Sequence, residues 1–221
     1  MKNKKYQVLI FDLDGTLINS KKGILEGYRY ALEKMGVQTY DPKLLLTFLG
    51  PPLYDNFRKH FFPDDSSSVE MAANYYKEYM RNKGKLEVEL IPGVREMIQV
   101  LFENKYSITL ATSKVQEFAD GFLEQFHIHQ YFSFVVGANL DGTRATKKEL
   151  IGKVLENFPT FKKSEFVMIG DREHDMIGAR ENSIDCIGVL YGYGNEKELK
   201  DTGATMIVQS VKELTKVFKS N

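Results

Sequence analysis

Short apolar runs rich in β-branched and aromatic residues alternate with helical segments along most of the chain. Few of these runs alternate strictly between apolar and polar residues, which is typical of strands buried on both faces. The predicted strands are residues 6–11, 106–111, 131–136, 165–170, 185–190 and 204–208. The predicted helices between and after them are residues 93–104, 114–126, 146–157, 173–182, 196–200 and 210–218.

This alternation predicts an α/β fold with a doubly wound parallel sheet, because successive parallel strands need crossover helices. The interval from residue 18 to residue 88 is the exception, since it carries helical patterning and no convincing strand. We therefore predict a core of residues 1–17 and 89–221 and an all-helical insert of about four helices at residues 18–88.

Composition limits the possible partners and the compartment. Thirty basic and thirty acidic residues cancel, so we expect no general attraction to nucleic acid or to an anionic membrane. No segment is apolar over a length that would span a bilayer, and "MKNKKY" makes a poor signal peptide. The single cysteine, Cys186, cannot form an internal disulfide and sits in a strand-like run. These features predict a soluble cytoplasmic protein with a buried Cys186.

Polar residues of selected types follow the predicted strands. The first four strands are followed by "DLDGT", "TSK", "GANLDGTRATKK" and "GDREHD". Ligands of open α/β sheets bind beyond the carboxyl ends of the strands, so we expect these segments to converge on one binding site.

The residue types at this edge predict a metal and phosphate site. Four carboxylates, Asp12, Asp14, Asp171 and Asp175, could gather only if a cation neutralises them or some are protonated. A ligand set made of oxygens favours a hard ion such as Mg²⁺. The hydroxyls of Thr112 and Ser113, together with Lys147 or Lys148, are groups that bind phosphate.

These segments resemble the motifs of a known family. "FDLDGTL", "ATS", the lysine after "DGTRAT" and "IGDREHD" match, in order, the four motifs of the haloacid dehalogenase superfamily. Within it the chain looks most like the phosphoglycolate phosphatase-like branch, which includes 5′-nucleotidase-like and pyrophosphatase-like members. The resemblance implies a Rossmann-like core, with residues 18–88 in the position of the family's helical cap.

The resemblance also implies catalytic roles for the two aspartates of "DLDGT". Asp12 would be the nucleophile that attacks phosphorus and becomes an aspartyl-phosphate. Asp14 would protonate the leaving alkoxide and then activate water, for which it must hold a proton when the substrate binds. Gly15 would let the loop turn tightly, so that its amides face the phosphate.

Roles at the other three motifs follow in the same way. Mg²⁺ would be held by Asp12, the backbone carbonyl of Asp14, and Asp171, and Asp175 would order a metal-bound water. Thr112, the Ser113 amide and Lys147 would bind the phosphoryl oxygens. The family pattern favours Lys147 over Lys148, which would then be a solvated helix residue.

Simpler interpretations stand beside these roles. Asp175 could be an acidic residue in the first turn of a helix. His127 and His129 have metal-pair spacing, but a surface turn is the better interpretation. His174 is interpreted as a residue that shapes the site. Arg144 could bind phosphate or be solvated. "GYGNE" (192–196) half-resembles a dinucleotide loop and reads better as a turn.

Together these features predict a Mg²⁺-dependent phosphomonoesterase that acts on a small phosphorylated metabolite, as a monomer or homodimer. Alternatives are a 5′-nucleotidase or pyrophosphatase of the same fold, or a sugar phosphomutase. The Gly-Pro-Pro sequence of "FLGPPLYDNF" (48–57) could form a stiff loop that points at the active site and closes over the substrate, or a plain turn.

Overall fold

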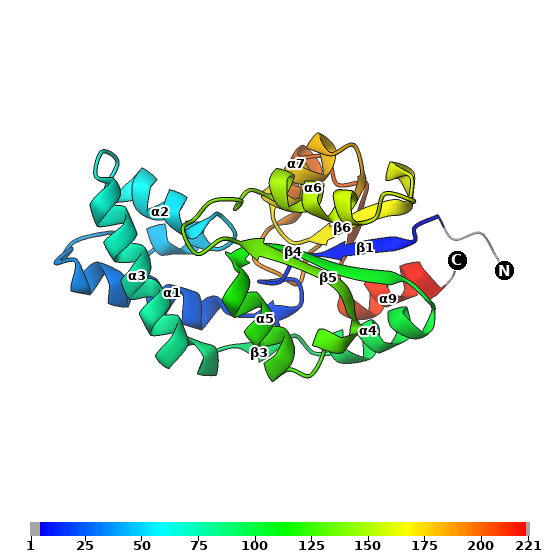
Figure 1. The fold of residues 1–221 in the computed structure, drawn as a ribbon, viewed down its shortest axis with the longest axis horizontal. Helices are drawn as coiled ribbons and strands as arrows, with labels where there is room; N and C mark the ends of the chain where they lie inside the picture. The colour runs from blue at the N-terminus through cyan, green and yellow to red at the C-terminus, as the bar shows by residue number, and fades with distance from the viewer. Residues whose placement is uncertain (1–4, 220–221) are drawn as a thin grey trace.

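The computed structural model describes residues 5–219 and contains the predicted parallel sheet (Figure 1). Within these residues the sheet has six strands in the order β5-β4-β1-β6-β7-β8, and all of its neighbours are parallel. The strands are β1 (Val8–Phe11), β4 (Ser107–Val115), β5 (Phe132–Ala138), β6 (Phe166–Gly170), β7 (Asp185–Val189) and β8 (Met206–Val208). All four residues of β1 are fully buried, which explains why this strand does not alternate.

Helices cover both faces of the sheet, as a doubly wound fold requires (Figure 1). One face carries α4 (Val94–Glu103), α5 (Gln116–Gln125) and α9 (Val211–Lys219). The other carries α6 (Lys147–Asn157), α7 (Glu173–Glu181) and α8 (Glu196–Asp201). Two short 3₁₀ helices, His129–Tyr131 and Lys163–Glu165, precede β5 and β6. The predicted α/β architecture is thus confirmed.

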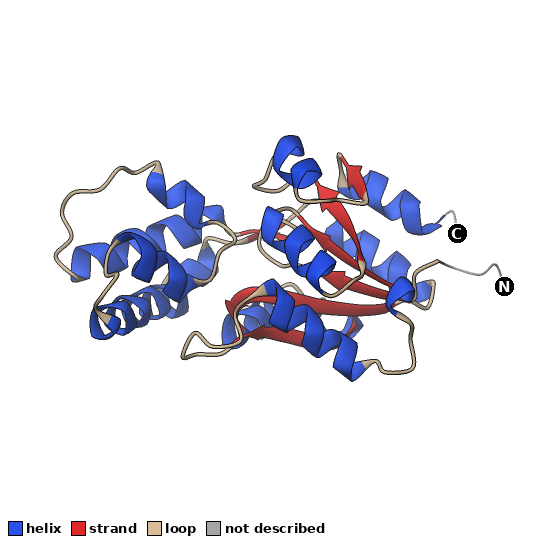
Figure 2. Cartoon of the chain, turned by 90° about the horizontal axis from the view of Figure 1, so that it is seen from above, coloured by secondary structure: helices blue, strands red, loops and turns tan. Residues whose placement is uncertain are grey.

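A separate group of helices lies beyond one end of the sheet (Figure 2). It consists of α1 (Lys21–Lys34), α2 (Leu53–His60), α3 (Ser66–Asn82) and two 3₁₀ helices, Leu44–Phe48 and Gly84–Leu86. The predicted helical insert includes the segment 41–50, which forms a 3₁₀ helix and not an α-helix. The backbone is extended at Leu49 and reaches a φ of +115° at Gly50, so this helix ends after five residues, Leu44–Phe48.

A two-stranded antiparallel ribbon connects the helical group to the sheet. Its strands are β2 (Ile18–Asn19) and β3 (Glu89–Leu90). The prediction of no strand in residues 18–88 therefore missed β2, because two residues are too short to show any periodicity. We infer that the ribbon marks the border between two domains; the division at residues 17/18 and 88/89 stays a prediction.

The hydrophobic core continues from the sheet into the helical group. Residues of β1 such as Leu9 and Phe11 belong to the same apolar cluster as Tyr28, Phe48 and Tyr76 of the helical group. A smaller cluster on the opposite face of the sheet includes Cys186, which is buried as predicted. Among residues 5–219, none of the helices combines the length and the apolar character needed to cross a bilayer.

Candidate active site

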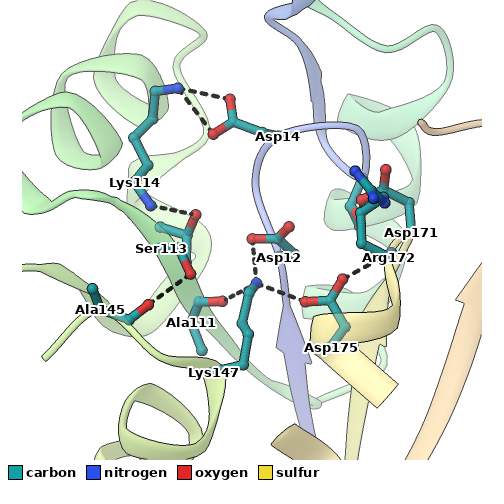
Figure 3. Close-up of polar contacts among 12 residues, drawn as sticks. Asp12, Asp14, Ala111, Ser113, Lys114, Ala145, Lys147, Asp171, Arg172 and Asp175 are labelled. Carbon is teal, nitrogen blue, oxygen red and sulfur yellow. Dashed lines mark hydrogen bonds and ion pairs between the residues drawn. The ribbon is translucent and has the colours of Figure 1, made fainter. Parts of the chain in front are cut away.

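Three predicted acidic residues meet where β1 and β6 end. Asp12 follows β1, and its backbone N–H donates to the carbonyl of Ile169 on β6, 2.9 Å away. Asp171 follows β6, and Asp175 lies in the first turn of α7. One carboxylate oxygen of each lies within 4.8 Å of the others, and all three side chains are buried (Figure 3). The parallel pairing of β1 with β6 produces this cluster, because it brings the carboxyl ends of both strands to one point.

Lys147 reaches into the cluster from the first residue of α6. Its Nζ lies 2.5 Å from Asp12 Oδ1 and 2.7 Å from Asp175 Oδ1, and it donates to the carbonyl of Ala111 at 2.9 Å (Figure 3). A capping box formed by Thr146 and Glu149 fixes the start of this helix. Lys148 is exposed and points to no acid of the cluster, so the structure brings Lys147 to the site.

The charges of the cluster do not balance. Burial raises the pKa of Asp12 to about 6, with the neighbouring Asp175 carboxylate adding to the effect and Lys147 opposing it. Burial also raises the pKa of Asp171 well above its ordinary value, again with help from Asp175 and Asp12. Burial alone would lower the pKa of Lys147, but the attraction of Asp12 and Asp175 outweighs it and the pKa is raised. One ammonium group therefore faces three buried carboxylates.

A divalent cation fits this donor set. Carboxylate oxygens are the ligands of hard ions such as Mg²⁺, Mn²⁺ and Ca²⁺, and a divalent charge would compensate the excess of two negative charges. Within residues 5–219, Asp12, Asp171 and Asp175 form the one group of acidic, histidine or cysteine side chains with the spacing to hold a metal. His127 lies in a turn and His129 begins the 3₁₀ helix that follows it, and neither belongs to this group.

Two groups that sequence reasoning did not assign hold Asp171 in place. Its Oδ2 accepts from the backbone N–H of Tyr193 at 2.7 Å, and its Oδ1 accepts from the Thr16 hydroxyl at 3.2 Å. "GYGNE" is a turn, as predicted, but it lies against the site. A Cβ at Gly192 would come within 2.3 Å of the Asp171 side chain, so only glycine lets this turn approach. Every residue except proline has a backbone N–H, so the sequence could not predict that the N–H of Tyr193 would bind Asp171.

Gly15 also packs directly on Asp171. Its φ is +82°, and a Cβ there would lie 2.2 Å from Asp171 Oδ2. We expect Gly15→Ala to lower the free energy of unfolding by more than twice as much as Gly36→Ala. Gly36 has a similar φ of +73° with no atom near its Cβ position, so its substitution reports the backbone cost alone, about 1–2 kcal/mol. Urea denaturation of both variants measures the difference; equal losses would contradict the close approach to Asp171.

Asp14 points away from the three-carboxylate cluster and forms an ion pair with Lys114. The Lys114 Nζ donates to Asp14 Oδ1 and Oδ2 at 2.8 and 2.9 Å, and both side chains are largely buried (Figure 3). The Ser20 hydroxyl also donates to Asp14 Oδ1, and Ser20 in turn contacts the Tyr193 hydroxyl. Lys114 belongs to the "TSK" segment but received no role in the sequence analysis. Its position directly after Thr112 and Ser113 was the feature of the sequence that could have indicated a place in the site.

Thr112 and Ser113 lie near the carboxyl end of β4, on the same cavity as Asp12. Thr112 is buried, and its hydroxyl accepts from the backbone N–H of Lys114 at 3.3 Å. The Ser113 hydroxyl donates to the carbonyl of Ala145 at 2.7 Å, which ties β4 to the loop before α6. The Ser113 hydroxyl is thus already engaged, while both residues line the same cavity as Asp12 and Asp14.

Two further residues of the sequence analysis lie at the margin of the site. Arg144 donates to the carbonyl of Gly137 at 3.1 Å and is half-buried, so it is neither simply solvated nor in contact with the acidic cluster. His174 is half-buried at the start of α7 and lines an outer cleft between α2 and α7, together with Lys148 and Arg172.

A small cavity of about 50 Å³ separates the helical group from the ends of the strands. Gly50 and Pro51 of the predicted Gly-Pro-Pro loop line it, so this loop does reach the site. Arg172, which directly follows Asp171, donates to the carbonyl of Leu49 and pairs with Glu198 at 2.7 Å. The loop is therefore fixed against the sheet by the segment that carries Asp171.

Comparison with known proteins agrees with this geometry. Residues 9–189 match the family model described as haloacid dehalogenase-like hydrolase. A 5′-nucleotidase of Pseudomonas aeruginosa is 35% identical over 98% of this chain and 97% of its own. The pyrophosphatase PpaX of Halalkalibacterium halodurans is 30% identical over 93% of this chain and 94% of its own.

A solved structure shares the whole fold. The crystal structure of a predicted phosphatase from Clostridium acetobutylicum superposes with a TM-score of 0.91 at 38% identity, covering 99% of this chain and 100% of that one. The chain therefore belongs to the haloacid dehalogenase-like hydrolase family, as one of its phosphatases.

Proposed function

We propose that this phosphatase hydrolyses a small soluble phosphate monoester, with Mg²⁺ as cofactor and Asp12 as nucleophile. The observation that carries the proposal is the buried cluster of Asp12, Asp171 and Asp175 around a single lysine, next to a cavity that Asp12 lines. The cluster offers carboxylate oxygens with which Asp12 and its neighbours would hold a divalent cation, and the cavity of about 50 Å³ would take the phosphoryl group. When bound, Mg²⁺ would neutralise charge on the phosphoryl oxygens.

The chain's own residues divide the reaction into two steps. An Asp12 carboxylate oxygen attacks phosphorus, and the bond from phosphorus to the ester oxygen breaks, leaving an aspartyl-phosphate and an alcohol. Water then attacks the phosphorus of that intermediate, which releases inorganic phosphate and restores Asp12. Lys147 holds the Asp12 side chain between the strands, and Thr112 and the Ser113 amide would bind the phosphoryl oxygens.

Asp14 is the proton carrier in this proposal. It would give a proton to the leaving oxygen and later take one from the attacking water. Lys114 donates to both oxygens of Asp14, so a proton on Asp14 has to replace one of these two hydrogen bonds. The Ser20 hydroxyl keeps the carboxyl group oriented while this exchange occurs.

Removal of divalent metal is expected to abolish turnover. Without a cation the three buried carboxylates repel one another and the phosphoryl oxygens. Release of phosphate from p-nitrophenyl phosphate should stop when EDTA is in excess, and return when Mg²⁺ exceeds the chelator. NaCl at the same ionic strength is the control and should restore nothing. Undiminished hydrolysis after complete chelation would refute the metal site.

A 5′-nucleotide is the second candidate substrate. It is supported by the Pseudomonas relative, which is named a 5′-nucleotidase and matches this chain over nearly its full length. Both candidates use the same reaction, so they differ only in the leaving group that the cavity must accept.

A further inference from the structure

The cavity above Asp12 is closed by aromatic side chains of the helical group. Its roof is formed by Tyr28 of α1, Phe48 of the 3₁₀ helix Leu44–Phe48, and Tyr76 of α3. Asp12, Asp14 and Thr112 lie on the side of the sheet. The Tyr28 ring contacts the rings of Phe48 and Tyr76, with its centroid 4.9 Å from each of theirs. A leaving group attached to a phosphoryl group at Asp12 would therefore face these three rings.

Two phenol hydroxyls in this roof have hydrogen-bonding capacity to spare. Tyr76 is 6% exposed, and among residues 5–219 its hydroxyl has no hydrogen-bond partner. The Tyr28 hydroxyl accepts from the Asn56 side-chain amide at 2.8 Å, which leaves its own proton available for donation. A substrate oxygen could therefore accept a hydrogen bond from either hydroxyl.

Both hydroxyls remain donors in the closed site. Burial raises the pKa of Tyr28 above its ordinary value, and the negative charge of Asp14 raises it further. Burial likewise raises the pKa of Tyr76, with Tyr28 and then Asp14 contributing. Both tyrosines line the cavity together with Asp14, the residue proposed to protonate the leaving oxygen.

The size and charge of the cavity restrict the leaving group. About 50 Å³ is far less than the roughly 300–1,000 Å³ of pockets for drug-sized ligands, so the cavity favours a small leaving group over a nucleoside. Of the lining residues, Lys114 is the one cation, and its ammonium group already contacts Asp14. A second phosphate would find no free cation there, whereas Ile24, Leu53 and Phe118 offer apolar contacts to a short carbon chain.

We propose that the Tyr28 and Tyr76 hydroxyls select the substrate by donating hydrogen bonds to oxygen atoms of its leaving group. The substrate is then the phosphate monoester of a short hydroxylated alcohol. This inference rests on the proposed phosphomonoesterase function and adds the class of leaving group and the residues that recognise it.

The test compares glycerol 1-phosphate with propyl phosphate, which have the same number of carbons and differ in two hydroxyls. The ratio of their kcat/KM values with Mg²⁺ is expected to exceed 10 in the wild type. Tyr76→Phe and Tyr28→Phe should each lower this ratio by about 5- to 10-fold, the usual effect of one hydrogen bond between neutral groups. A merely structural role would change both kcat/KM values equally and leave the ratio unaltered. Tyr75→Phe, a neighbour on α3 outside the cavity lining, is the control and should keep the wild-type ratio.

The possible outcomes distinguish a failure of this inference from a failure of the proposed function. A ratio near 1 in the wild type, or an unchanged ratio in both variants, would overturn the inference while leaving a phosphomonoesterase in place. A higher kcat/KM for AMP or pyrophosphate than for glycerol 1-phosphate would do the same. If neither these compounds nor p-nitrophenyl phosphate release phosphate, the proposed function itself fails, and the inference with it.

Discussion

Asp12→Asn is expected to lower kcat for phosphate release by about 10⁴-fold or more, which is the range found when an essential nucleophile is removed. Asparagine has nearly the same shape, so the substrate and the metal can still approach, but its amide oxygen is a far weaker nucleophile than a carboxylate. A direct assay follows the covalent step. Wild-type enzyme quenched in acid during turnover of ³²P-labelled ester should retain label on the protein, and the variant should retain none.

Folding should survive this substitution. Asp12 is buried beside Asp175, and burial and that neighbour both disfavour its ionised form. Removing the charge therefore relieves some repulsion, and Lys147 keeps its contact with Asp175. The matched control is Asp64→Asn, because Asp64 is exposed in the turn between α2 and α3. That variant should retain full activity. A loss of less than about 10²-fold in Asp12→Asn would exclude Asp12 as the nucleophile.

The acidic cluster could be predicted from sequence because topology alone produces it. Apolar runs that end in "DLDGT" and "GDREHD" become neighbouring parallel strands, and parallel strands bring their carboxyl ends together. The same reasoning brought Lys147 to this edge, although it could not exclude Lys148. The structure distinguishes the two lysines at the start of α6, because Lys147 is buried and Lys148 is exposed.

Other contacts of the site depend on how individual side chains point, which the pattern of apolar and polar residues does not predict. Lys114 and Asp14 are 100 positions apart, and their contact depends on how two loop side chains turn relative to each other. Tyr28 and Tyr76 lie at helical positions that read as ordinary core residues, and they do pack in the core. Both residues line the cavity because the helical group sits over the strand ends, and periodicity within α1 or α3 carries no information on that placement.

Lys147→Met is expected to have the largest effect on stability. Methionine keeps most of the volume of lysine but leaves Asp12, Asp171 and Asp175 buried without a cation. Removing one partner of a buried ion pair typically costs about 3–5 kcal/mol, because the remaining charge is uncompensated. In urea denaturation with EDTA present, we expect the free energy of unfolding to fall by about that amount. Saturating Mg²⁺ should recover part of the loss, because a ligand that binds only the folded state stabilises it.

Lys148→Met is the matched control, since it makes the same chemical change one position along the same helix. Lys148 is exposed and contacts none of the three carboxylates, so its substitution should change stability by no more than about 0.5 kcal/mol. Phosphate release should fall sharply in Lys147→Met and stay near the wild-type rate in Lys148→Met. Equal effects of the two substitutions would contradict the assignment of Lys147 to the cluster. If Mg²⁺ recovers none of the stability lost in Lys147→Met, the metal does not bind the carboxylates that Lys147 contacts. A cation held by the same carboxylates must offset part of their repulsion.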